Sequence, residues 1–168
     1  MPEIIVVASA CLLLMVDLFL RKGRKHIIAY LSLIVILIAA GETLRLSGGN
    51  IQVFYRMFAA DSFSAFFKML FYLSTALCIL LSINYAKIED IEHGEYYILM
   101  LFALSGMMIM ASAIDLISIY VGLELMAISV YALTGFMKRS VRSNEAAMKY
   151  VILGAVSSGI LIYGISLV

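Results

Sequence analysis

Six long apolar segments dominate this sequence of 168 residues. An α-helix needs roughly twenty mostly apolar residues to cross the apolar core of a bilayer, which is about 30 Å thick. The segments are too long and too evenly apolar for the strands of a lipid-facing barrel, which alternate with period two. The sequence therefore predicts an all-α membrane protein, a bundle of six transmembrane helices. The predicted spans are residues 4–20, 27–44, 62–85, 96–113, 116–137 and 146–168.

The composition argues against a soluble protein. Hydrophobic residues make up 64% of the chain and charged residues 14%, against about 45–50% and about 25% in soluble domains. A net charge of +1 and two cysteines also disfavour disorder, nucleic-acid binding and a disulfide-stapled secreted domain. Cys11 and Cys78 fall inside apolar segments and are interpreted as buried thiols.

Lysine and arginine are unevenly distributed among the connecting segments, and this predicts the orientation. The first, third and fifth connections hold eight of them and the second holds two. By the positive-inside rule, the N-terminus lies outside and the basic connections face the cytoplasm. The positive charges follow the first span, so we expect it to be no signal peptide but a retained helix. The eight are Arg21, Lys22, Arg24, Lys25, Lys87, Lys138, Arg139 and Arg142, and the two are Arg45 and Arg56.

Short polar segments suggest how the helices begin and connect. A turn signal at residues 46–50 precedes a β-prone run at 51–55, which predicts a small hairpin outside the cytoplasm. Asp61, Asp115 and Ser143 are predicted to be N-caps. Because no repeat or long linker divides the chain, we expect residues 1–168 to form one transmembrane domain, or part of one.

Few ionisable groups fall inside the spans, where each costs about 2.5–3.5 kcal/mol at the bilayer centre. Asp17 and Glu42 lie within a turn of span ends and can reach the interface. Lys68 lies about two turns into its span and either snorkels outward or has another reason to be there.

Glu124 lies near the midplane of the fifth span, from which a carboxylate cannot snorkel. A helix places Tyr120, Ala127 and Tyr131 on its face, with Gly122 nearby. If a basic neighbour or a water chain stabilises the ionised form, Glu124 can bind and release a proton. The alternative is a glutamate that only hydrogen-bonds another helix.

Lys149 begins the sixth span. Glu145, one turn earlier, has the spacing of a stabilising helical pair, and the side chain could also reach the interface. In a hairpin that turns near Val141, Lys149 lies beside Thr134 and about 15 Å along the axis from Glu124. A direct pair is therefore not expected, and a hydrated relay or a third group would be needed.

The remaining motifs indicate helix packing and none of the nucleotide-binding, redox or metal sites of soluble enzymes. Two pairs of small residues in the sixth span favour close helix approach. There is no GxGxxG, P-loop, CxxC or HExxH motif, and His26 and His93 have no metal partners at ligand spacing. No cofactor or metal is assigned to this chain. The small-residue pairs are Gly154 with Ser158 and Ala155 with Gly159.

Several segments resemble subunit N of the proton-translocating NADH:quinone oxidoreductase, respiratory complex I. They are Tyr-Val-Gly-Leu-Glu-Leu at 120–125, Leu-Thr-Gly-Phe-Met-Lys-Arg at 133–139, Asn-Glu-Ala-Ala-Met-Lys-Tyr at 144–150, Gly-Ala-Val-Ser-Ser at 154–158 and Asp-Ser-Phe-Ser-Ala-Phe-Phe-Lys at 61–68. The resemblance is specific from residue 116 to 168 and weaker before that.

The resemblance implies the first six helices of an antiporter-like fold and a proton half-channel. Glu124 matches the family's essential glutamate of the fifth helix, and Lys149 matches the lysine at the start of the sixth. It further implies proton translocation coupled to quinone reduction, in a multi-pass subunit of the cell inner (plasma) membrane. The partners would be other membrane subunits and the lipid bilayer, and the chain would bind no nucleic acid, NADH or quinone itself.

This chain departs from the family in length. Family members have about fourteen helices, with further lysines in the seventh, eighth and twelfth, so six helices alone cannot complete a proton path. The chain is either a fragment or a short version whose other half lies on another chain. The alternatives for function are a subunit of a multisubunit cation/proton antiporter and a structural helical membrane protein in which Glu124 only joins helices.

Overall fold

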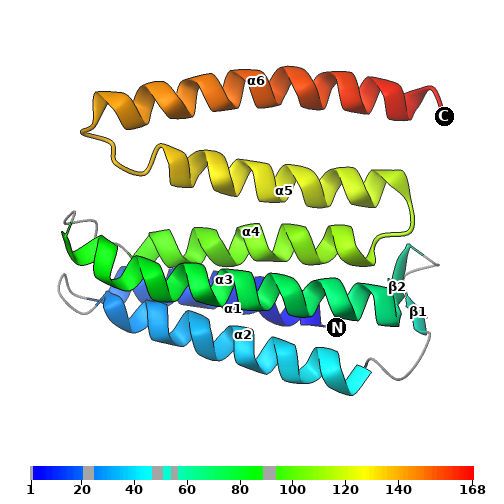
Figure 1. Ribbon diagram of the computed structural model, residues 1–168, viewed down its shortest axis with the longest axis horizontal. Coiled ribbons are helices and arrows are strands. Elements are labelled where there is room, and N and C mark those ends of the chain that lie inside the picture. Colours follow the sequence, from blue (N-terminus) through cyan, green and yellow to red (C-terminus); the bar gives the residue numbers. More distant parts are fainter. Residues whose placement is uncertain (1, 21–24, 47–50, 54–56, 89–93) are drawn as a thin grey trace.

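The computed structural model describes residues 2–20, 25–46, 51–53, 57–88 and 94–168 of the chain (Figure 1). All six described helices are long and apolar enough to cross a membrane. The chain is therefore a multi-pass membrane protein, and the predicted bundle of six transmembrane helices is confirmed. The elements are α1 (Pro2–Phe19), α2 (His26–Leu46), β1 (Ile51–Val53), β2 (Phe58–Ala60), α3 (Ser62–Ile88), α4 (Gly94–Ser112), α5 (Leu116–Thr134) and α6 (Val141–Ser166).

The two ends of the bundle differ in what connects the helices. At one end, on the right in Figure 1, lie β1, β2 and the short link between α4 and α5, and we call this the hairpin end. At the other, the basic end, α1 leads to α2, α3 to α4 and α5 to α6. Lys25, Lys138 and Arg139 lie at the basic end. The side chains of Arg21, Lys22, Arg24, Arg56 and Lys87 are outside the described part, and the orientation stays a prediction.

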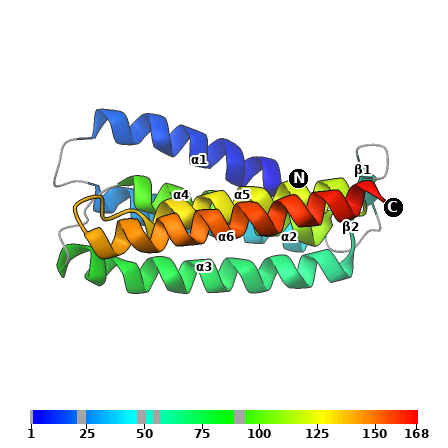
Figure 2. The same ribbon diagram turned by 90° about the horizontal axis from the view of Figure 1, so that it is seen from above.

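Helix α4 is the centre of the packing. It contacts α1, α2, α3 and α5, whereas α6 packs against α5. Figures 1 and 2 together show α6, α5 and α4 in a row, with α1 and α3 on either side of it. Half of the residues in the most apolar stretch of α4 are buried inside the chain, whereas none of those in α6 is buried. The core is apolar and includes Val6, Ala10, Ile28, Ile36, Ile79, Leu101, Leu104 and Met108.

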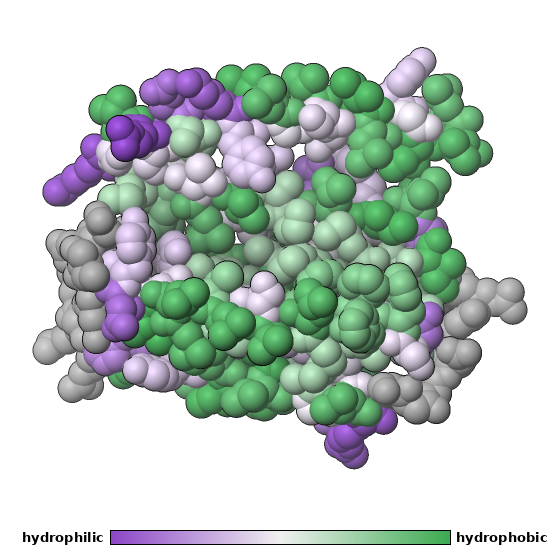
Figure 3. Space-filling model, in the orientation of Figure 1, coloured by the Kyte–Doolittle hydropathy of each residue, from purple (hydrophilic) through white to green (hydrophobic). Residues whose placement is uncertain are grey.

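The outer faces of the helices are apolar as well, because lipid replaces water around them. Figure 3 shows apolar residues over the middle of one face and most hydrophilic residues toward its ends. Cys11 and Cys78 are exposed on this surface, so the prediction of buried thiols is wrong. An apolar segment around a cysteine does not distinguish the core from the lipid face, since both are apolar.

Helices α4 and α5 approach each other closely through two glycines. A Cβ atom added at Gly106 would lie 2.6 Å from the Gly122 carbonyl oxygen and 2.6 Å from the Met126 nitrogen. A Cβ added at Gly122 would lie 2.9 Å from the Gly106 carbonyl oxygen. These are backbone atoms that no rotamer change can move, so the contact between the helices requires glycine.

The predicted hairpin exists, and it links two parts of the chain. β1 pairs antiparallel with β2, with Ile51 opposite Ala60 and Val53 opposite Phe58. The Ile114 N–H donates to the Met57 carbonyl at 2.9 Å, which joins the hairpin to the link between α4 and α5. Residues 47–50 and 54–55, which belong to the predicted turn and β-prone run, lie outside the described part.

Two of the three predicted N-caps are confirmed. Asp61 accepts from the Ser64 N–H at 2.8 Å, and Asp115 caps α5 by accepting from the Ser118 N–H at 3.1 Å. Hydrogen bonding from Ser118 lowers the pKa of Asp115 below its ordinary value. Ser143 is not the cap of α6, because the helix begins earlier at Val141 and Ser140 caps it.

The ends of α5 and α6 differ from the predicted spans. α5 stops at Thr134 because Gly135 terminates it, and α6 begins five residues before the predicted residue 146. A span predicted from hydropathy omits the polar first turn of a helix, although the Ser140 cap allows that turn to form.

We expect Gly106→Ala to destabilise the protein by about 1–3 kcal/mol, because the added methyl group forces α4 and α5 apart. Thermal denaturation in detergent micelles measures this effect. Gly41→Ala in α2 is the matched control, since no atom lies within 4 Å of a Cβ added there. Equal melting temperatures for both variants would contradict the close packing of α4 on α5.

Candidate functional site

Glu124 lies near the middle of α5, on the side of the helix that faces α6. Its helix begins at Leu116 and ends at Thr134, so the carboxylate is about 12 Å along the axis from the nearer end. The side chain is half-buried between the two helices. The predicted position of this carboxylate within the membrane is therefore consistent with the fold.

Hydroxyl groups surround the Glu124 carboxylate. The Ser158 hydroxyl of α6 donates a hydrogen bond to its Oε1 atom, and the phenol of Tyr120, one turn earlier on α5, also interacts with it. Within the described part of the chain, no lysine, arginine or histidine forms an ion pair with Glu124. The carboxylate thus has hydrogen-bond donors but no balancing cation nearby.

α5 and α6 pack against each other along an interface, here called the seam, that brings Ser158 to Glu124. The Tyr131 ring packs edge-on against Tyr150 with ring centroids 4.8 Å apart, and a Cβ atom at Gly154 would collide with the Tyr131 phenol. Gly154 and Ser158 are one turn apart and both face α5, as predicted for a small-residue pair. The second predicted pair does not pack in this way, since nothing lies within 4 Å of a Cβ at Gly159.

Gly154 lies in the interface between α5 and α6, but Gly122 does not. Gly122, which the sequence placed near Glu124, faces α4 instead and approaches Gly106. α5 therefore uses one face for close packing against α4 and another for Glu124.

Lys149 is separated from Glu124. Its Nζ atom lies 2.5 Å from the Oε1 atom of Glu145, and both side chains are more than half exposed, at 71% and 60%. Because Ser158 touches Glu124 and is nine residues beyond Lys149, the two charges are about 14 Å apart along the helix. The prediction that Lys149 makes no direct pair with Glu124 is confirmed. The predicted helical pair of Lys149 with Glu145 is confirmed as well.

Lys68 is buried rather than extended toward the interface. Its side chain is 4% exposed, and its Nζ atom lies 2.6 Å from the Glu3 Oε1 atom of α1. The interpretation that Lys68 snorkels outward is therefore wrong. An ion pair with a neighbouring helix satisfies the ammonium inside the bundle instead.

The other predicted interfacial acids also have partners. Asp17 is buried, and its Oδ2 atom lies 3.1 Å from Lys25 Nζ. The lysine side chain therefore extends to the acid, near the basic end of the bundle. Glu42 is exposed and pairs with Arg45 at 3.1 Å.

In the described part of the chain, no three histidine, cysteine, aspartate or glutamate residues lie together as metal ligands would. His26 is exposed at the start of α2, and His93 lies outside the described residues. The assignment of no cofactor stays a prediction.

Sequence reasoning missed two contacts of these buried groups. Ser158 was assigned only to helix packing, although a hydroxyl in a small-residue pair can also donate to a carboxylate across the seam. The sequence predicts no partner for Glu3. A signal existed, since a buried lysine requires an acid nearby, but the separation of 65 positions in the sequence hides the pairing.

We expect Ser158→Ala to lower the stability of the protein by about 1 kcal/mol, because Glu124 loses its hydrogen bond from α6. Ser157→Ala is the matched control, since the exposed Ser157 hydroxyl donates only to the Leu153 carbonyl of its own helix, at 2.9 Å. The melting temperature in detergent micelles distinguishes the two. If Ser157→Ala lowers the melting temperature as much as Ser158→Ala does, the hydrogen bond between Ser158 and Glu124 contributes nothing to stability.

Two protein families match this sequence. Residues 1–84 match the family described as "NAD(P)H-quinone oxidoreductase subunit 2 N-terminal". Residues 113–168 match the family described as "NADH:quinone oxidoreductase/Mrp antiporter, TM", and this second range contains Glu124 and Lys149.

Individual relatives agree with these families. The chain is 57% identical over 167 residues to NADH-quinone oxidoreductase subunit N 2 of Rhizobium meliloti and covers 35% of that protein. It is 44% identical over 168 residues to NADH-quinone oxidoreductase subunit N of Trichlorobacter lovleyi and covers 34% of it. The alignments include 99% and 100% of this chain, which therefore spans about a third of the length of these relatives.

A solved structure has the same fold. A chain of the respiratory complex I from Thermus thermophilus with bound aureothin matches 98% of this chain with a TM-score of 0.81 at 26% identity, over 35% of its own length. Together, the glutamate-bearing α5–α6 segment, the matched families and the relatives agree with the resemblance seen in the sequence. The chain belongs to the subunit N family of the NADH-quinone oxidoreductases.

Proposed function

We propose that this chain contributes to proton translocation in the membrane arm of an NADH:quinone oxidoreductase, coupled to quinone reduction elsewhere in the complex. The observation that carries the proposal is Glu124, a carboxyl group in the middle of a spanning helix that has hydroxyl partners and, within the described residues, no ion-pair partner. It lies in the range matched by the antiporter-type family. The proposal concerns the whole protein, of whose relatives this chain spans about a third.

Glu124 would carry the proton on its carboxyl group. Ser158 and Tyr120 stabilise the ionised form by hydrogen bonding, and protonation removes the charge that the apolar surroundings disfavour. A change in charge near the open face of α6 would shift the balance between the two forms. In this way, electrostatic events in neighbouring parts of the complex would load and unload the proton.

Lys149 would act on Glu124 over a distance. Two unit charges about 14 Å apart interact by about 1 kcal/mol at an effective dielectric constant of about 20. This is enough to bias the protonation of a carboxyl group, but less than a contact pair would provide. Lys149 is thus proposed as a secondary group on the proton route.

The chain itself would hold no redox group. It would bind neither NADH nor quinone and carry no cofactor, and its partners would be other membrane subunits of the complex and lipid. Solved structures with this fold come from multisubunit respiratory complexes, which supports such an assembly. We place it in the cell inner (plasma) membrane, with the N-terminus outside.

A second candidate is a subunit of a multisubunit cation/proton antiporter without redox partners. The observation that favours it is the shared family of residues 113–168, whose description includes both kinds of protein. The match of residues 1–84 to a quinone oxidoreductase family favours the first candidate. Copurification of the chain with quinone reductase activity would support the first, and its absence from every quinone-reducing complex would support the second.

Glu124→Gln tests the proposal directly, since glutamine keeps the size and the hydrogen bonding but cannot titrate. We expect loss of proton pumping in membrane vesicles that contain the assembled complex, with the amount of complex unchanged. Glu42→Gln is the control, because Glu42 is exposed and pairs with Arg45 of its own helix. Normal pumping by the Glu124 variant would support a purely structural role.

We expect Lys149→Met to reduce pumping without abolishing it, because its interaction with Glu124 acts across about 14 Å. Pumping per electron transferred is measured in the same vesicles. Lys138→Met removes an equally charged and exposed residue from the link before α6 and serves as the control. Indistinguishable rates in the two variants would remove Lys149 from the proton route.

A further inference from the structure

A second buried acid–base pair lies at the hairpin end of the bundle, away from Glu124. Glu3 of α1 and Lys68 of α3 are 14% and 4% exposed, and 2.6 Å separates their charged atoms. The Ser112 hydroxyl at the end of α4 donates to the same Glu3 Oε1 atom at 2.8 Å. Three helices thus meet at one carboxylate.

Two further polar groups lie near this pair, Tyr72 on α3 and Thr43 on α2, the remaining helix of the core. Tyr72, one turn beyond Lys68 on α3, interacts electrostatically with Glu3, and its hydroxyl lies 3.0 Å from the Thr43 hydroxyl of α2. Tyr72 and Thr43 are both buried. All four helices of the core therefore contribute polar side chains to one place in an otherwise apolar interior.

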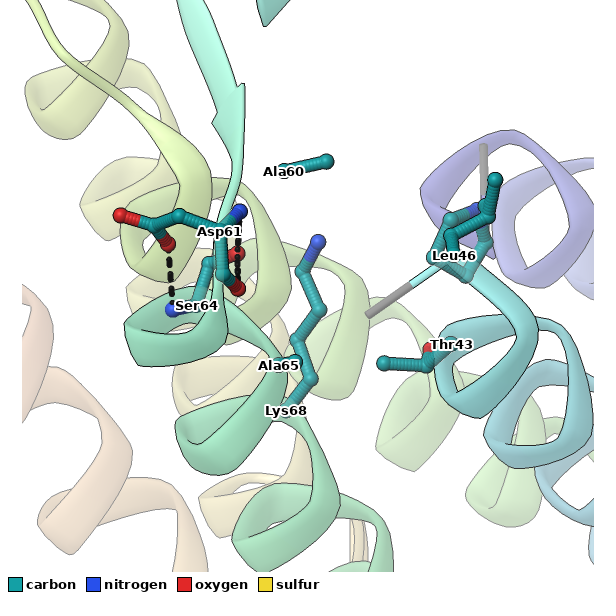
Figure 4. Close-up of a pocket in the computed structure, with 8 residues that line it drawn as sticks. Thr43, Leu46, Ala60, Asp61, Ser64, Ala65 and Lys68 are labelled. Atoms are coloured by element: carbon teal, nitrogen blue, oxygen red, sulfur yellow. Dashed lines mark hydrogen bonds between the residues drawn. The ribbon is translucent and has the colours of Figure 1, made fainter. Parts of the chain in front are cut away.

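A small cavity lies beside Lys68. Its volume is about 20 Å³, most of its lining is apolar, and Thr43, Asp61, Ser64 and Lys68 are the polar residues that line it. One water molecule needs about 10–15 Å³. Figure 4 shows the Lys68 side chain rising from α3 toward the level of Ala60, between Asp61 and Leu46.

The ammonium has hydrogen-bonding capacity left for such a water. It carries three N–H donors, and in the described part of the chain its one ionic partner is Glu3. Asp61 lies at the start of α3, seven residues or about 10 Å closer to the end of the bundle than Lys68. A water in the cavity would therefore lie between the buried pair and the membrane surface at the hairpin end.

We propose that Glu3, Lys68 and the adjoining cavity form a second proton-exchange site, which passes protons between the membrane interior and the hairpin end. The inference deepens the proposed function and rests on it. Ser112 and Tyr72 position the pair, and Asp61 lies at the outer mouth of the site.

The exchange needs no partner other than water. In the structure, the pair is an ammonium and a carboxylate without net charge. Moving a proton from Lys68 Nζ to Glu3 Oε1 breaks an N–H bond and forms an O–H bond, which leaves an amine and a carboxylic acid, again without net charge. The acid then releases its proton to water in the cavity, and the amine takes up another proton to restore the ion pair.

The position of the pair suits a route that continues from Glu124. Ser112 is six residues from Gly106 on α4, and Glu124 is two residues from Gly122 on α5. Because these two glycines touch, the sites are about 12 Å apart along the bundle axis. Glu124 lies at mid-depth and the Glu3–Lys68 pair lies closer to the hairpin end.

The alternative is that the pair only fastens α1 to α3, and Lys68→Arg separates the two roles. Arginine keeps the positive charge and the ion pair, but it releases a proton at least about a hundredfold less readily than lysine. We expect normal assembly of the complex and a severalfold loss of proton pumping per electron transferred. Lys25→Arg, in the Asp17–Lys25 pair at the basic end, is the matched control and should pump normally.

Each outcome decides the matter. Normal pumping by an assembled Lys68→Arg complex overturns the proposal, and if Glu124→Gln stops pumping in the same assay, the proposed function still stands. If Lys68→Arg does not assemble, the double variant Glu3→Gln/Lys68→Met removes both charges, and assembly without pumping supports the site while normal pumping overturns it. If neither assembles, Ser112→Ala decides in the same way, because it removes a single hydrogen bond from Glu3.

Discussion

The apolar interior of the membrane gives every ionisable side chain within the spans a cost that a partner must offset. This constraint explains the contacts between helices that are far apart in sequence. Glu3 of α1 lies against Lys68 of α3, and Asp17 at the other end of α1 lies against Lys25. α1 is therefore joined to α3 by a charge pair near its start and to the segment before α2 by another near its end. In lipid, where apolar surfaces gain little from associating, such polar contacts and close packing hold helices together.

The helices differ in how closely they pack, and Glu124 lies where a closely packed helix meets a loosely packed one. α1 to α4 surround one another, and the glycines of α4 and α5 bring those helices into backbone contact. α6 is attached through α5 and has no residue buried within the described part of the chain. The carboxylate thus lies at the seam between a firmly packed core and a helix that is open on its other side.

The sequence predicted the six spans, the hairpin, two helix caps and the position of Glu124, because each depends on local pattern. It did not predict which distant groups meet. From the sequence, Lys68 either extends to the interface or has another reason to lie in its span, and only the arrangement of the helices shows that Glu3 is within reach. The exposed Cys11 and Cys78 have the same explanation, since hydropathy cannot distinguish a lipid-facing side from a core-facing one. Family comparison added the functional context, which physical reasoning on residues alone did not supply.

Glu124 differs from the other buried carboxylates in what balances its charge. Glu3 and Asp17 each lie against a lysine, so that each pair has no net charge in its ionised form. Glu124 receives hydrogen bonds from hydroxyl groups, which stabilise a carboxylate without neutralising it. In the described part of the chain, no cation pairs with it. Because α6 has no residue buried within the described part of the chain, a charged group that packed against its outer face, from the rest of a longer chain or from another subunit, would act on Glu124 across a single helix.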